Sequence, residues 1–140
     1  MVTQTREASD DLWQALTDLL PQLSTSAPTL TRGHLDALLA TPSTNMLAAR
    51  LDSTIVGVTI VVIYPLMSGV RARIEDVVVN QSVRGCGIGE ALTRAAIELA
   101  RAHHARTVDL TCTPSRSAAR KMYARCGFQP RDTTNYRLSI

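Results

Sequence analysis

Aromatic residues and cysteines are scarce in this sequence. Its 140 residues include one Trp, three Tyr and one Phe. Proteins that bind single-stranded nucleic acid stack bases on aromatic side chains, so this scarcity argues against that class. The three cysteines, Cys86, Cys112 and Cys126, are an odd number and lack metal-site spacing. We therefore expect no metal, no disulfide framework and a reduced, cytoplasmic setting.

The sequence also lacks an uninterrupted hydrophobic run. Its longest uncharged stretch, between Asp52 and Arg71, is broken by two glycines and a proline and is rich in Val and Ile. This composition predicts strands and not a membrane helix. The first 13 residues carry acidic side chains and no apolar run, unlike a signal peptide. An apolar content of 45% excludes a disordered chain, and the length favours a single domain over residues 1–140.

Negative charge is scarce in the second half of the chain. Residues 1–70 hold three Arg and six acidic residues, a balance of −3, whereas residues 71–140 hold eleven Arg, one Lys and six acidic residues, a balance of +6. The second half is therefore expected to attract anions, either nucleic acid or a phosphorylated cofactor. Because the basic residues are scattered and aromatics are few, the cofactor is favoured.

Hydrophobic periodicity predicts alternating helices and strands. The expected helices cover residues 8–22, ended by Pro21; residues 32–41, capped by Thr31; residues 88–103; and residues 116–126, with Ser115 as N-cap and Gly127 after the end. The expected strands cover residues 46–51, 54–64, 70–79, 107–112 and 136–140, with a turn at residues 52–53. This order predicts a mixed α/β fold, one sheet with helices packed on it.

Strict alternation in the strand over residues 70–79 predicts its two faces. One face would carry Arg73, Glu75, Val77 and Val79, and the other Ile74, Asp76 and Val78.

The stretch "SVRGCGIGEAL", residues 82–92, places three glycines in five positions between a predicted strand and a predicted helix. Exposed N–H groups and the helix dipole make such a turn an anion site, and Arg84 adds a full charge. A Walker loop would need Lys and Ser or Thr after its last glycine, and a dinucleotide fingerprint would need Gly at position 90. Neither is present, whereas Arg-x-x-Gly-x-Gly is matched by Arg84, Gly87 and Gly89.

Two segments together resemble the GNAT superfamily of acetyl-CoA-dependent N-acetyltransferases. "RIEDVVVNQSVRGCGIGEAL" is similar to the cofactor motif of that family, and "SAARKMYARCGF", about thirty residues later, to its second motif. The resemblance implies an α/β fold with a single mixed, largely antiparallel twisted sheet, helices on both faces and splayed central strands.

The resemblance also implies how acetyl-CoA binds. The pantetheine arm would pair with the backbone of Val77, Val78 and Val79, in the gap where strand 70–79 splays from strand 107–112. The pyrophosphate would lie on the loop formed by Arg84, Gly85, Cys86, Gly87, Ile88 and Gly89. Alternatively, the glycines only turn the chain. Arg116 stands where the family often has Asn. Three alternatives are open for its side chain: it contacts a cofactor phosphate, it contacts a substrate carboxylate, or it lies on the surface.

Two side chains are the predicted catalytic residues. Tyr123 occupies the position of the family's usual general acid, which protonates the CoA thiolate as it leaves; a plain core tyrosine is the alternative. Glu75 is the candidate base for the ammonium of the acceptor, and pairing with Arg73 is its alternative.

The expected reaction is acetyl transfer to a primary amine by direct attack. The acceptor, a small molecule or a peptide, is not identified by the sequence. A non-catalytic acyl-CoA-binding module and a nucleic-acid binder are the rival hypotheses. No nucleic-acid or membrane partner is expected, and "NYRLSI" offers a strand for a possible homodimer.

Overall fold

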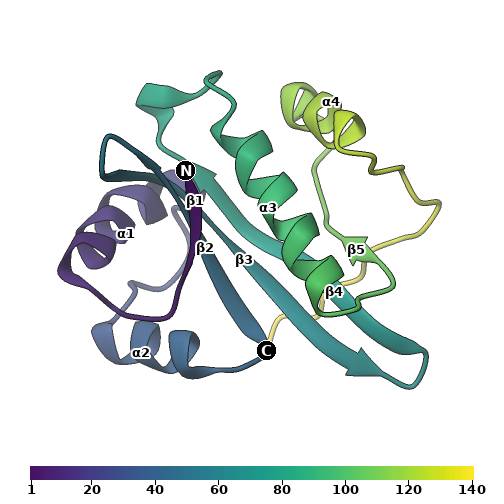
Figure 1. Ribbon diagram of the computed structural model, residues 1–140. Helices are drawn as coiled ribbons and strands as arrows, with labels where there is room; N and C mark the ends of the chain where they lie inside the picture. The colour runs from purple at the N-terminus through teal and green to yellow at the C-terminus, as the bar shows by residue number, and fades with distance from the viewer.

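The computed structural model describes residues 1–140 and is built on one five-stranded sheet with the strand order β1-β2-β3-β4-β5 (Figure 1). The first four strands pair antiparallel, and β5 pairs parallel with β4. The sheet is therefore mixed and largely antiparallel, as predicted. Its strands are β1 (Val2–Thr5), β2 (Thr44–Leu51), β3 (Thr54–Leu66), β4 (Gly69–Val79) and β5 (Val108–Asp109).

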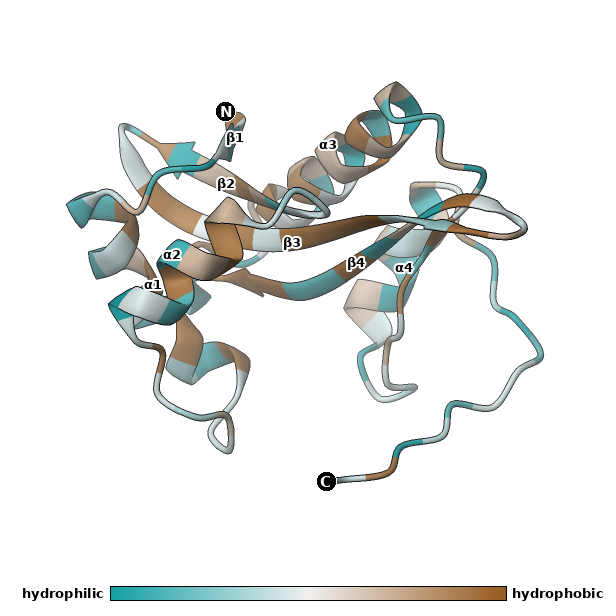
Figure 2. Ribbon diagram, turned by 90° about the horizontal axis from the view of Figure 1, so that it is seen from below, coloured by the Kyte–Doolittle hydropathy of each residue, from teal (hydrophilic) through white to brown (hydrophobic).

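Helices cover both faces of the sheet, which confirms the predicted layers (Figure 2). They are α1 (Asp10–Leu23) and α2 (Arg32–Ala40) on one face and α3 (Ile88–Ala102) on the other, with α4 (Ser117–Arg125) beside α3. Apolar residues from α1 and α2 pack with one side of β2, β3 and β4, and α3 packs on the other side through Leu92, Ala96 and Ala100. None of the helices is both long enough and apolar enough to span a membrane.

A bulge in β4 overturns the predicted alternation of that strand. Val58 pairs with Val78 and Ile60 with Glu75, so two residues of β4 lie opposite Thr59. Asp76, at the bulge, has a φ of +51°, a conformation that Asp tolerates better than most residues. The Thr59 hydroxyl donates to the Glu75 carbonyl at 3.1 Å.

The extra residue moves the second half of the strand by one position. Val77 and Val79 pack on the α3 side, together with Ala72 and Ile74. Val78 packs on the α1 and α2 side. Glu75 and Val77 therefore face opposite sides of the sheet, because a one-residue shift reverses every later side chain.

Several other predicted boundaries differ from the structure. The strand predicted over residues 107–112 is reduced to Val108–Asp109, because only Val108 and Asp109 pair with β4. Helix α1 continues past Pro21 to Leu23, where the Ser24 N–H donates to the Leu20 carbonyl at 3.1 Å. Helix α4 begins at Ser117, with Arg116 and not Ser115 at its N-cap. Residues 129–140 form no strand and their side chains are exposed, because no neighbouring strand pairs with them.

Strand β1, which the sequence did not predict, is held by a polar network. The Asn45 side chain, 2% exposed, donates to the Val61 carbonyl at 3.0 Å. Its Oδ1 accepts from Gln4 at 2.9 Å and from Arg6 at 2.6 Å. Arg6 also donates to backbone carbonyls at the end of α2 and the start of β2. The network joins β1, β2, β3 and α2 through hydrogen bonds, in addition to their apolar contacts.

Candidate functional site

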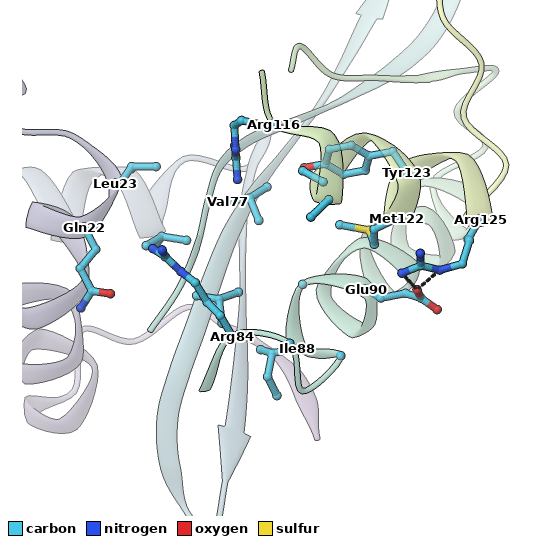
Figure 3. Close-up of a pocket in the computed structure, with 17 residues that line it drawn as sticks. Gln22, Leu23, Val77, Arg84, Ile88, Glu90, Arg116, Met122, Tyr123 and Arg125 are labelled. Carbon is cyan, nitrogen blue, oxygen red and sulfur yellow. Dashed lines mark hydrogen bonds and ion pairs between the residues drawn. The ribbon is translucent and has the colours of Figure 1, made fainter. Parts of the chain in front are cut away.

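A cleft of about 700 Å³ opens beside the last third of β4 (Figure 3). Its walls come from the end of α1, the strand β4, the glycine loop with the start of α3, and helix α4. The lining residues are Gln22, Leu23, Val77, Val78, Val79, Arg84, Gly85, Gly87, Ile88, Gly89, Glu90, Arg116, Ala118, Ala119, Met122, Tyr123 and Arg125. Segments that lie up to about a hundred positions apart in the sequence therefore meet at one site.

The strand wall of the cleft is an unpaired sheet edge. Strand β5 pairs with β4 only at Ala72 and Arg73, and no strand continues along β4 from Ile74 to Val79. The predicted splay of the two strands is therefore present. An edge of this kind offers backbone N–H and C=O groups that an extended ligand can pair with.

The glycine loop presents backbone donors without partners. Gly85 and Gly87 have φ values of +82° and +80°, which L side chains rarely adopt. A Cβ at either position would meet no atom within 4 Å. Glycine is therefore required at these two positions by the positive φ and not by close packing. No backbone N–H from Gly85 to Glu90 donates to a protein acceptor. With the α3 dipole behind them, these groups form a concave donor surface for an anion.

The charges in the cleft favour an anion as well. Glu90 accepts from Arg125 at 3.0 Å and from Arg94 at 3.2 Å, and these hydrogen bonds, that from Arg125 first, lower the pKa of its carboxyl. The only acidic residue of the lining is thus neutralised. Arg84 and Arg116 extend into the cleft and have no acidic partner (Figure 3).

Tyr123 is fixed by the way α4 ends. The Phe128 N–H donates to the Tyr123 carbonyl and the Gly127 N–H to the Ala124 carbonyl, both at 3.0 Å, and Gly127 has a φ of +98°. This is the Schellman arrangement. Its usual apolar contact is the edge-to-face pair of Tyr123 with Phe128, whose ring centroids are 5.8 Å apart. The end of the helix therefore fixes the direction of the phenol.

The phenol of Tyr123 is held in its protonated form. Only 7% of the residue is exposed. Burial raises the pKa of the hydroxyl, and the positive charge of Arg116 offsets part of that rise. No protein group accepts a hydrogen bond from the hydroxyl, which points into the cleft (Figure 3). The Tyr123 hydroxyl is therefore free to donate a hydrogen bond to a molecule bound in the cleft.

Comparison with known proteins identifies the family. The Acetyltransferase (GNAT) family matches residues 8–128. The chain belongs to the GNAT acetyltransferase family. This assignment confirms the resemblance found in the two sequence motifs and the fold class inferred from it.

Individual relatives of this GNAT chain agree with the assignment. Glucosamine 6-phosphate N-acetyltransferase 1 of Oryza sativa subsp. japonica is 41% identical over 56 residues, which cover 40% of this chain and 32% of the relative. The match thus spans about a third of that protein. A putative acetyltransferase from Agrobacterium tumefaciens str. C58 superposes with a TM-score of 0.84 at 27% identity, covering 99% of each chain. The glucosamine-6-phosphate N-acetyltransferase of Arabidopsis thaliana, at 18% identity and a TM-score of 0.81 over 99% and 98% of the two chains, shares the fold.

Most of the predicted site residues of this GNAT chain meet in the cleft. Tyr123, Arg116 and all the predicted cofactor residues except Cys86 line it. Cys86 is exposed on the loop, outside the lining. Glu75 lies outside the cleft as well, with its Oε1 2.6 Å from Arg73 Nε, so the alternative partner named for it is present.

Sequence reasoning missed part of the site. Gln22 and Leu23 reach the cleft from the end of α1, and only the three-dimensional packing brings them there. It also missed lining residues from the two helices beyond the glycine loop: Glu90, Ala118, Ala119, Met122 and Arg125. Asp76, which alternation placed away from Glu75, lies outside the cleft and is exposed at the surface. Burial, and then the charge of Glu75, raise the pKa of its carboxyl.

Proposed function

We propose that this protein transfers an acetyl group from acetyl-CoA to a primary amine. The observation that carries the proposal is the run of unpartnered N–H groups from Gly85 to Glu90, which adjoins the open edge of β4 and faces Tyr123. Membership in the GNAT family supports it, as do the curated relatives, which are named N-acetyltransferases. No observation favours the non-catalytic module.

The residues of the cleft fit CoA. The loop from Arg84 to Gly89 offers N–H groups and a guanidinium to the pyrophosphate, and the positive torsions of Gly85 and Gly87 allow those groups to converge. The backbone of Val77, Val78 and Val79 would pair with the amides of the pantetheine arm. Arg116 is placed to meet a further anionic group of the donor. Acetyl-CoA supplies an acyl group activated as a thioester.

The chemistry follows from the two sides of β4. The amine of the acceptor attacks the thioester carbonyl, a C–N bond forms and the C–S bond breaks. The Tyr123 hydroxyl gives its proton to the departing sulfur and recovers one from the amine nitrogen through solvent. Glu75, on the opposite side of the sheet, is proposed to take the first proton from the ammonium, because its Oε2 has no protein partner while Oε1 is held by Arg73.

The proposal also covers the cellular environment and the oligomeric state of the protein. The three cysteines form no disulfide, which supports a reducing, cytoplasmic environment. A homodimer formed through residues 136–140 remains a prediction.

The test combines binding and turnover. Acetyl-CoA is expected to raise the Tm of the protein, and thiol release should appear with at least one member of a panel of primary amines. Tyr123→Phe keeps the ring contact with Phe128 and should lower kcat by about 100-fold while the CoA-induced shift persists. Absence of any shift with millimolar acetyl-CoA would refute donor binding. A shift without thiol release from any amine would support the non-catalytic module.

A further inference from the structure

The face of β4 opposite α3 carries Glu75, the proposed base, and further polar groups that the proposed reaction does not use. Arg71 pairs across the sheet with Tyr64, Arg73 with Val62, and Glu75 with Ile60. Cross-strand partners project to the same side of a sheet, and Ile60 and Val62 belong to the core under α1 and α2. Arg71, Arg73, Glu75 and Tyr64 therefore share one face, on the hairpin that extends past α1 and α2 (Figure 2).

Arg71 has an unexplained buried donor on this face. Its Nε is buried and has no hydrogen-bond partner, and the side chain makes one long hydrogen bond of 3.5 Å from Nη2 to the Ser68 hydroxyl. A buried donor of a charged group that is left unpaired is costly, so a ligand that pairs with it would be favoured. Arg71 also forms no ion pair, whereas Arg73 is matched by Glu75 at 2.6 Å.

The acidic groups of the same face lie near Arg73. Asp109 is paired with Arg73 across β4 and β5 and accepts from the Thr107 hydroxyl at 3.3 Å. Glu75 lies two residues beyond Arg73. Arg71 is thus separated from Glu75 by four residues, about 13 Å along the strand, with Arg73 about halfway. Arg71 is therefore the cation without an ion-pair partner at the hairpin end of this face, and Glu75 is the carboxylate at the bulge end.

Along β4, the order Glu75, Arg73, Arg71 leads away from the cleft in which we propose that the donor binds. If the pantetheine arm runs from the glycine loop along Val79 to Val77, its thioester end points toward Glu75. An amine presented there would leave the rest of its acceptor lying over Arg73 and Arg71. We infer that Arg71, whose cross-strand partner is Tyr64, binds an oxyanion of the acceptor, a phosphate monoester or a carboxylate, in a molecule whose amine lies on the Glu75 side. This inference rests on the proposed function and names the acceptor class for the same site.

The test uses three amino sugars that differ only at C6: glucosamine, glucosamine 6-phosphate and glucosaminuronic acid. The anionic sugars should exceed glucosamine in kcat/KM by about 10-fold or more, since charge-assisted, bidentate contacts of Arg are among the strong ones. The ratio between the phosphate and the carboxylate identifies which oxyanion is used. Arg71→Gln should remove most of the advantage and leave the acetyl-CoA-induced Tm shift unchanged. Arg101→Gln, which removes the same charge from an exposed position of α3, is the matched control and should keep the advantage.

A binding measurement separates this inference from the proposed function. Calorimetry with the anionic sugars in saturating CoA should detect binding to the wild type and a loss of about 10-fold or more in Arg71→Gln. Turnover of glucosamine at the rate of its anionic forms, or an equal loss in both variants, would overturn the inference while the acetyltransferase proposal stands. No CoA binding and no turnover would instead overturn the proposed function, and with it this one.

Discussion

Replacing Gly127 by Ala tests whether the end of α4 depends on a left-handed backbone. Gly127 has a φ of +98°, and a Cβ there would meet no atom within 4 Å. Steric conflict with neighbours is therefore absent and only torsional strain remains. That strain is about 1–2 kcal/mol, and the lower entropy of the unfolded alanine chain offsets about 0.5 kcal/mol of it. The expected net loss of stability is about 1 kcal/mol, which corresponds to a fall in Tm of about 4 °C.

Gly33 provides a matched control for this substitution. It lies in the first turn of α2, and a Cβ there also meets nothing within 4 Å, but its φ is not positive. Gly33→Ala should therefore raise stability by about 0.5 kcal/mol. Thermal and urea unfolding of both variants should give shifts of opposite sign. Shifts of equal sign and size would refute the torsional reasoning. Gly127→Ala should also lower kcat, because the Schellman turn orients Tyr123.

Three further predictions concern the bulge, the polar network and the seam between helices. Burial raises the pKa of Asp76 above that of a free aspartate, so ionisation costs stability as pH rises through the folded-state pKa; Asp76→Asn should be more stable than wild type at pH 7 in urea unfolding, and the gain should disappear below about pH 4, where both states are protonated. Asn45→Ala removes the buried donor to the Val61 carbonyl and the acceptor of Gln4 and Arg6 and should lower the unfolding free energy by about 1–3 kcal/mol, whereas Asn135→Ala, on the exposed C-terminal segment, should not change it. Arg125→Met removes the 2.9 Å ion pair that joins α4 to α3 and should speed hydrogen exchange in α4; Arg94→Met, which breaks only a pair within α3, should not, and equal exchange in both variants would contradict the role of this ion pair.

Much of the fold was predictable because local signals were strong. The structure contains the Thr31 cap, the turn at residues 52–53 and the glycine after α4. Each of these features either adopts a specific torsion angle or pairs a backbone N–H that would otherwise lack a partner. The cleft that we propose binds acetyl-CoA was predictable from the two motifs, since a strand, a glycine loop and a helix start can meet in few ways.

The failures have physical reasons as well. Strand β1 carries little apolar patterning, because Gln4 and Arg6 hold that segment by hydrogen bonds to Asn45. The bulge at Asp76 depends on the pairing of β4 with β3, which no local pattern in β4 reveals. Residues 136–140 alternate like a strand but find no neighbour, and a strand exists only with a partner.

The bulge gives one strand two independent tasks. Before it, β4 presents side chains to the face on which we place the acceptor; after it, the strand offers an unpaired backbone edge to the donor cleft. The side chains of Arg71 and Arg73, which face away from α3, can thus be exchanged to suit a different acceptor without altering the backbone groups of residues 77–79. An engineer seeking a new acceptor would vary the hairpin half of β4 and leave the bulge, the valines and the glycine loop unchanged.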